Sequence, residues 1–172
     1  MAVFEGSCHV DTSHLVDFED RLNADWIGAR SMVHIIAEFF QPLISSQSLE
    51  LAIYYQRLLI IQMEKVLREM LKDKSEVTVG RRGDDLFVAL RKGLAQKLSV
   101  SIATTSAVSV LIHWGINLDA TGAPDHVNAA GLCSTLGFTP LDVLQFTKTS
   151  LEGYIEELEE IKLAQCKVQP RL

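Results

Sequence analysis

Breakers of regular structure are scarce in this sequence, which has four prolines and ten glycines among its 172 residues. Because proline and glycine interrupt helices and strands, their scarcity favours long uninterrupted elements. No stretch approaches the roughly 20 apolar residues that a membrane-spanning helix needs. The first residues also lack the basic start and apolar run of a secretory leader. We therefore expect no membrane partner and a cytoplasmic location.

Paired cysteines and basic clusters are missing as well. Cys8, Cys133 and Cys166 lie far apart and form no CxxC pair, so we expect neither a disulfide framework nor a zinc module. The formal net charge is −6, whereas a protein that binds nucleic acid normally presents a basic surface to the phosphates. The sequence therefore argues against a nucleic-acid partner, and we expect no cofactor.

The composition is that of a folded globular protein, with 48% apolar and 22% charged residues. A length of 172 residues suits one domain. We expect a single helical domain over residues 1–172, in which 1–10 and 168–172 are tails. A short strand is the alternative for residues 1–10.

Apolar residues recur at helical spacing along most of the chain, and capping residues precede several of these stretches. The pattern predicts an all-α fold, a single-domain bundle of about six helices. The expected helices cover about 13–22, 25–42, 49–74, 84–98, 124–136 and 139–166. Residues 99–116 are rich in Val, Ile, Ser and Thr, and they fit either a buried helix or a pair of strands. The helical neighbours favour the helix.

The clearest helix start lies at residues 139–142. Thr139 suits the N-cap, Pro140 suits the first helical position, and Asp142 lies three residues after the cap. These residues predict that the last helix begins here and continues to about Cys166.

The helix expected over 49–74 is apolar almost all round in its first half. Such a helix is either central to the core or shared with a second subunit. We predict a homodimer, with an interface that includes Leu51, Tyr55, Leu58, Leu59 and Ile60.

The stretch 79–90 contains Gly80-Arg81-Arg82-Gly83-Asp84-Asp85. It resembles the R-x-G-G-D-E-F hairpin of diguanylate cyclases, with Arg82 in the place of the first hairpin glycine. In those folds the paired acids lie on a hairpin between strands and help to bind a metal ion. The resemblance implies an alternative function, a metal-dependent nucleotide or signalling domain in which Asp84 and Asp85 hold a divalent ion.

The same stretch also resembles the third homology motif of the B-cell-lymphoma-type apoptosis regulators. The residues that fill the motif are Val79, Gly80, Gly83, Asp84 and Leu86. Further along, Ile112-His113-Trp114-Gly115 is similar to the Asn-Trp-Gly core of that family's first motif, with His113 in the place of the asparagine. This resemblance implies another alternative, a helical groove that binds amphipathic helices.

Six residues are the candidate binding residues on these grounds: Arg81, Arg82, Asp84, Asp85, His113 and Trp114. A pocket that gathered the two arginines with His113 and Trp114 would favour a small anionic ligand.

The N-terminal residues Cys8, His9, Asp11 and His14 have the side-chain types that bind zinc. No second cluster pairs with them, so we predict no metal site.

Catalytic patterns are missing too, since the sequence has no Gly-x-Ser-x-Gly elbow and no phosphate-binding loop. We predict no catalytic residue, and the sequence gives no positive sign of an enzyme. By elimination, the expected function is a helical protein–protein interaction or regulatory module, acting as a dimer.

Overall fold

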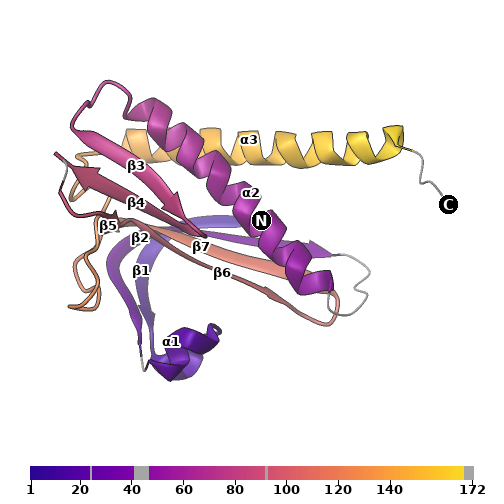
Figure 1. The fold of residues 1–172 in the computed structure, drawn as a ribbon, viewed down its shortest axis with the longest axis horizontal. Coiled ribbons are helices and arrows are strands. Elements are labelled where there is room, and N and C mark those ends of the chain that lie inside the picture. Colours follow the sequence, from indigo (N-terminus) through magenta and orange to yellow (C-terminus); the bar gives the residue numbers. More distant parts are fainter. Residues whose placement is uncertain (24, 41–46, 92, 169–172) are drawn as a thin grey trace.

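The computed structural model describes residues 1–23, 25–40, 47–91 and 93–168. Within these residues the fold is mixed α/β, with seven strands in two antiparallel sheets and three α-helices (Figure 1). The prediction of an all-α bundle of about six helices is therefore wrong. The alternative for residues 1–10 is present, because Ala2–Val10 form a strand.

The larger sheet has the strand order β1-β2-β7-β6, and the smaller one has the order β3-β4-β5. The strands are β1 (Ala2–Val10), β2 (Ile27–Phe40), β3 (Val77–Arg82), β4 (Asp85–Leu90), β5 (Gln96–Lys97), β6 (Ser99–Thr105) and β7 (Ser109–Asp119). The helices are α1 (Phe18–Leu22), α2 (Gln47–Met70) and α3 (Pro140–Lys167), with a 3-10 turn, η1, at Thr12–His14.

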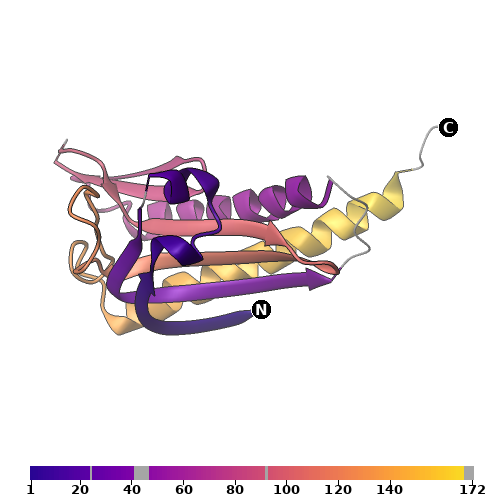
Figure 2. The ribbon, with the colours of Figure 1, turned by 90° about the horizontal axis from the view of Figure 1, so that it is seen from below.

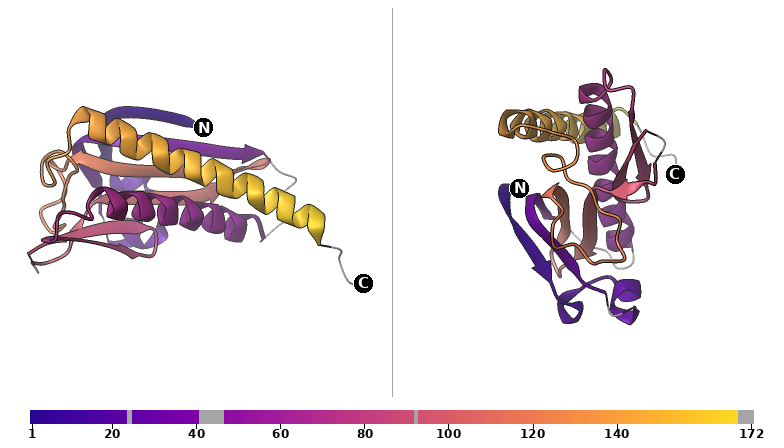
Figure 3. Two further views of the ribbon diagram at one scale, coloured as in Figure 1. Left: turned by 90° about the horizontal axis from the view of Figure 1, so that it is seen from above. Right: turned by 90° about the vertical axis from the view of Figure 1, so that its left-hand side faces the viewer.

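Helices α2 and α3 cover one face of the larger sheet, and the segment with η1 and α1 lies on the opposite face (Figures 2 and 3). Side chains alternate between the two faces of each strand. On the helix face, Ile35 of β2 and Trp114 of β7 join Leu59 of α2 and Phe146 of α3 in the hydrophobic core. Burial of each such side chain contributes about 1.5–3 kcal/mol. The other sheet face is left for the segment between β1 and β2.

The helix predicted over 25–42 is wrong, because residues 27–40 form β2. Val33, Ile35 and Ala37 face the helices, while Met32 and His34 face the opposite side. A strand that is covered on both faces has a nearly continuous apolar sequence, which also fits a helix. The predicted end of that helix, Pro42, lies outside the described residues.

The helix predicted over 84–98 is also wrong. Gly83 has a φ of 61° and turns the chain from β3 into β4, where Arg82 pairs with Asp85. Glycine at the first central position of a two-residue turn is typical of a tight hairpin. The diguanylate cyclase resemblance implied a hairpin at this point, although the surrounding fold differs.

Residues 99–116 form β6 and most of β7, so the strand alternative is right and the favoured helix is wrong. Their many β-branched residues suit a strand that packs on both faces. No helix forms over 124–136 either; the backbone N–H groups of Ala130 and Leu132 instead donate to Lys97 and Asn117. The first predicted helix is reduced to η1 and the five residues of α1.

Two helix predictions are confirmed. Residues 47–70 form α2, and α3 begins at Pro140 behind a capping box in which the Asp142 N–H donates to Thr139 Oγ1 at 3.2 Å. At the other end α3 stops at Lys167, and residues 169–172 lie outside the described part of the chain. Among the described helices, none has the length and apolar character to cross a membrane.

Candidate functional site

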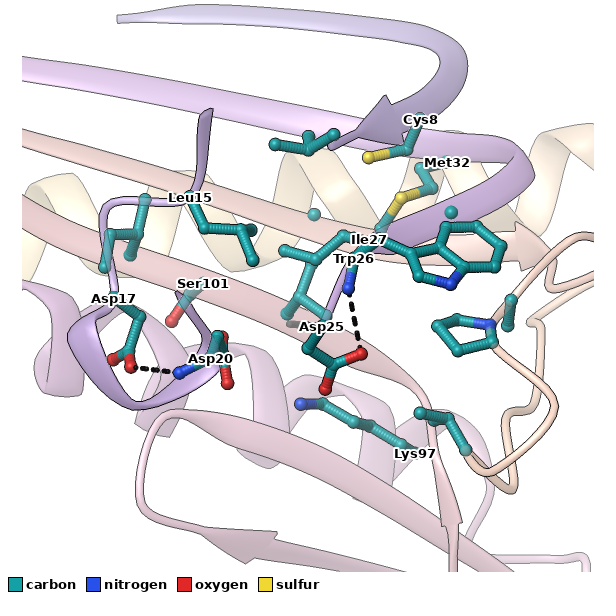
Figure 4. A pocket seen from close by; sticks show the side chains of 18 of the residues that line it. Cys8, Leu15, Asp17, Asp20, Asp25, Trp26, Ile27, Met32, Lys97 and Ser101 are labelled. Atoms are coloured by element: carbon teal, nitrogen blue, oxygen red, sulfur yellow. Dashed lines mark hydrogen bonds between the residues drawn. The ribbon is translucent and has the colours of Figure 1, made fainter. Parts of the chain in front are cut away.

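A pocket of about 400 Å³ lies on the sheet face opposite α2 and α3 (Figure 4). Outward side chains of β2, β7 and β6 form its floor, among them Met32 and Ile102. The segment between β1 and β2 forms its roof with Leu15 and Trp26. One end is closed by β5 and by residues 123–129. Both the floor and the roof thus combine apolar side chains with polar ones, and the charged residues at the closed end come from β4 and β5.

Lys97 lies at this polar end, on a backbone that is held from two sides. On one side Lys97 pairs with Phe87 of β4. On the other side its N–H donates to Asn128 O at 2.7 Å, and its carbonyl oxygen accepts from the Ala130 N–H at 2.9 Å. The side-chain Nζ lies 2.9 Å from Asp85 Oδ2. Lys97 carries the only lysine or arginine side chain among the described residues that line the pocket.

Asp85 and Asp84 follow the Gly83 turn and reach the same end of the pocket. Burial raises the pKa of the Asp85 carboxyl, Lys97 opposes this shift, and the charges of Asp84 and Asp20 add to it. Asp84 accepts hydrogen bonds from Arg57 Nη1 at 3.1 Å and from Gln56 Nε2 at 3.0 Å. These contacts tie the turn to α2.

The roof is fastened to the loop after β7. Asp25 Oδ1 lies 3.3 Å from His126 Nε2. A Cβ on Gly28 would lie 2.4 Å from both the Gly122 carbonyl oxygen and the Trp26 ring, so only glycine fits where these segments meet. The close approach keeps the Trp26 side chain over the pocket (Figure 4).

Two histidines lie side by side on the pocket floor. His34 Nδ1 is 3.1 Å from His113 Nε2, and Phe4 stacks on His34 with ring centroids 5.0 Å apart. His34 is buried and His113 is exposed toward the pocket. Burial and the neighbouring His34 lower the pKa of His113.

The six predicted binding residues do not form one site. Asp84, Asp85 and His113 line the pocket. Arg81 instead donates to Gly83 O and approaches Glu64, and Arg82 lies over the Phe87 ring. Trp114 is fully buried in the core. Neighbouring strand residues point to opposite faces, so His113 and Trp114 are separated by the sheet.

The predicted dimer interface is only partly at the surface. Leu59 and Ile60 are fully buried against the sheet within the chain. Leu51, Tyr55 and Leu58 are partly exposed, and the Tyr55 ring also lies tilted against Phe39, with centroids 4.6 Å apart. Homodimerisation through the exposed part of α2 stays a prediction.

The N-terminal cluster is divided between two places. Cys8 and His14 line the pocket, whereas His9 pairs with Asp11 at 3.2 Å on the surface. No group of three or more His, Cys, Asp or Glu side chains in the described part of the chain is arranged to hold a metal ion.

Four residues that line the pocket were not predicted from the sequence: Trp26, His34, Lys97 and Asn117. One signal was available in residues 109–118. Read as a strand, this stretch places His113, Gly115 and Asn117 on one face and Ile112, Trp114 and Ile116 on the other. Small and polar residues at alternate positions mark a face that is not packed on the core.

Comparisons with known proteins find relatives that are longer than this chain. The sequence model of a family described as a domain of unknown function (DUF366) matches residues 1–169. An uncharacterized protein of Methanocaldococcus jannaschii is 28% identical over 174 residues, which cover 99% of this chain and 71% of that protein. A solved protein of unknown function from Pyrococcus horikoshi is 35% identical, with a TM-score of 0.78 and coverage of 99% of this chain and 81% of that one.

Biotin protein ligase from Aquifex aeolicus is similar in fold. A mutant of this ligase in complex with biotin has a TM-score of 0.54 at 12% identity, over 91% of this chain and 61% of the ligase. The ligase in complex with biotin and ATP has a TM-score of 0.51 at 16% identity, over 76% and 51%. At these identities the likeness concerns the fold alone.

Proposed function

Because this chain belongs to the DUF366 family, a family of unknown function whose fold is similar to that of biotin protein ligase, we propose a function from its pocket. The pocket binds a small organic acid with an apolar body, and Lys97 contacts the acid's carboxylate. The observation that carries this proposal is the position of Lys97. Its ammonium group is the one lysine or arginine charge among the described lining residues, and it lies at one end of a pocket that also has apolar side chains in its floor and roof.

The charges around Lys97 support this role. A carboxylate that leaves water for an enclosed site needs a cation or hydrogen-bond donors. Three of the five aspartates that line the pocket form ion pairs: Asp84 with Arg57, Asp25 with His126, and Asp85 with Lys97. A fourth, Asp17, accepts a hydrogen bond from the Asp20 N–H. An ammonium group has three donor hydrogens, so Lys97 can bind Asp85 and a ligand oxygen together.

The apolar part of the pocket supports the rest of the proposal. Met32, Val100 and Ile102 on the floor face Leu15 and Val16 in the roof. These side chains suit a hydrocarbon body and offer it no hydrogen bond. Biotin protein ligases, which have this fold, have been solved with biotin and with biotin and ATP. A carboxylic acid and a nucleotide are accordingly the first ligands to test.

The test is isothermal titration calorimetry with octanoic acid and with biotin, each with and without magnesium ATP. We expect at least one acid to bind the wild-type protein. Lys97→Met removes a charge-assisted hydrogen bond, which contributes about 1.5–3 kcal/mol, so its affinity falls about 10- to 100-fold. Lys97→Arg retains part of the affinity.

Lys148→Met is the matched control, because Lys148 is exposed on α3, where it pairs with Glu152, and does not line the pocket. We expect it to bind like the wild type. Should Lys97→Met misfold with Asp85 left unpaired, the double variant Lys97→Gln with Asp85→Asn replaces the ion pair by neutral groups of similar size. The proposal is overturned if no acid binds, or if folded Lys97 variants bind with unchanged affinity.

A further inference from the structure

The His34–His113 pair lies on the same pocket floor as Lys97 but has no part in the binding just described. His34 is a nearly buried polar side chain, with Phe4 stacked on one side and Met32 beside it. Such a group normally serves a specific polar contact. For His34 this contact is the hydrogen bond between its Nδ1 and His113 Nε2. The paired rings therefore present one polar point on an apolar surface.

The distance between this point and Lys97 is defined by the register of β7. Asn117 lies beside Lys97, since the Asn117 N–H donates to the carbonyl oxygen of the next residue, Leu98, at 2.9 Å. His113 lies four residues earlier on the same strand, which corresponds to about 13 Å at the ~3.3 Å rise per residue of a strand. Both ends belong to one continuous pocket.

The floor between the two points carries small and apolar residues beside the buried His34. Gly115 lies midway and pairs with Val100 of β6 and with His34 of β2. A Cβ on Gly115 would come within 2.7 Å of the Met32 methyl group, so Met32 fills the space that a larger residue would take. An extended hydrocarbon chain fits over Gly115, and the imidazole of the neighbouring His34 directs its Nδ1 to His113 at the far end.

We propose that the His34–His113 pair is a second recognition point, which binds a hydrogen-bonding or anionic group at the far end of the ligand. The ligand is then an acid of medium chain length that carries an oxygen-containing group at the end opposite its carboxylate. This inference rests on the proposed function, because it assigns the first carboxylate to Lys97.

The chemistry of the pair suits such a group. When both rings are neutral, one nitrogen donates the shared proton and the other accepts it. The outer nitrogen of His113, Nδ1, is then a donor or an acceptor according to the tautomer. The pair can therefore accept a hydrogen bond from a ligand hydroxyl group or donate one to it. If the ligand carries a second carboxylate at this point, its negative charge favours the protonated, positively charged form of the pair. Binding of such a ligand then takes up a proton from solution.

Other titratable groups line the same pocket or share its strand face, and they enter the pH dependence of binding. Cys8 comes from β1. Glu38 lies four residues after His34 on β2 and therefore on the same face of the strand. His14, Asp17 and Asp20 come from the roof. The variants below therefore change His113 alone and leave these groups in place.

The test compares three acids of equal chain length: octanoic acid, its omega-hydroxy analogue and suberic acid, which has a second carboxylate. Affinities are measured by calorimetry across pH 5.5 to 8, an interval of about one unit or more on each side of ordinary histidine titration. We expect the two acids with a polar end to bind the wild type about tenfold more tightly than octanoic acid, as one hydrogen bond provides. The suberic acid affinity rises further as the pH falls.

His113 is the residue to change, because it is exposed whereas His34 is buried. In His113→Phe the preference for polar-ended acids disappears and octanoic acid binds as before. In His113→Gln the preference for the hydroxy acid remains, but the pH dependence specific to suberic acid is lost. His9→Gln is the control for the loss of a histidine, since His9 is exposed, pairs with Asp11 and touches the pocket only through the outer side of Trp26, with ring centroids 5.8 Å apart.

The outcomes separate the two proposals. If no acid binds the wild type, both are overturned. If octanoic acid binds through Lys97 and the polar-ended acids show no advantage, only the second recognition point is overturned. The same holds if His113→Phe keeps the preference, or if zinc or copper titration shows stoichiometric binding that depends on His113, because the pair would then be a metal site.

Discussion

Asp84 is expected to stabilise the fold, because its carboxylate joins three elements. Oδ1 accepts from Arg57 Nη1 at 3.1 Å, and Oδ2 accepts from Gln56 Nε2 at 3.0 Å and from Ser101 Oγ at 3.1 Å. Helix α2, the turn between β3 and β4, and strand β6 meet at this side chain. In Asp84→Asn the shape is kept, but an NH₂ group replaces one oxygen and faces donors.

The expected loss of stability follows from these contacts. A hydrogen bond to a charged group contributes about 1.5–3 kcal/mol, and a partly exposed ion pair contributes about 1 kcal/mol or less. The Arg57 and Asp84 side chains are 35% and 33% exposed, so solvent screens their attraction. We expect Asp84→Asn to lower the free energy of unfolding by about 2 kcal/mol, and Asp84→Ala by about 3 kcal/mol. For this chain length the asparagine variant corresponds to a Tm about 4–8 °C lower.

The assay is urea unfolding followed by far-ultraviolet circular dichroism. Asp73→Asn is the control, because Asp73 is exposed in the turn after α2 and its substitution is expected to change stability by less than about 0.5 kcal/mol. If Asp84→Asn unfolds at the same urea concentration as the wild type, Asp84 does not join these elements as described.

Two further predictions concern stability. Thr139→Ala removes the side-chain half of the capping box at the start of α3 and costs about 1 kcal/mol in urea unfolding; an unchanged midpoint would show that the cap contributes little. His113 has a pKa below its ordinary value of 6.5. Between the pKa of His113 in the folded chain and its ordinary value, the unfolded chain binds more protons than the folded one. The free energy of unfolding therefore falls as the pH drops below 6.5, and it becomes constant once the pH is below the pKa of the folded state. The slope is expected to be smaller in His113→Gln, and equal slopes would contradict the assignment.

Local signals in the sequence were sufficient for the two long helices. Thr139, Pro140 and Asp142 are adjacent in the chain and act on the backbone beside them, so the start of α3 was predicted correctly. The apolar half of α2 indicated that this helix lies at the centre of the core, and Leu59 and Ile60 are fully buried there. The same apolar surface was assigned to a dimer, because the sequence does not distinguish a sheet of the same chain from a second subunit.

The strands depended on partners far away in the chain. Ile35 lies opposite Trp114 only because β2 and β7 pair across 79 positions. A strand covered on both faces by other segments has apolar residues nearly throughout, and periodicity then favours helix and strand equally. For residues 99–116 the sequence left both open, and the pairing of β6 with β7 decided between them.

The pocket belongs wholly to the tertiary structure. Asp84, Asp85 and His113 were selected from the sequence for their chemistry, and all three line it. Lys97 and His34 carry no local motif and gain their roles from Asp85 and His113, which the sheets bring beside them. Scarcity of breakers, acidic charge and helix caps are properties of neighbouring residues, and the sequence by itself determined these. Which residues share one face of one sheet is a matter of strand register, and only the folded chain decides it.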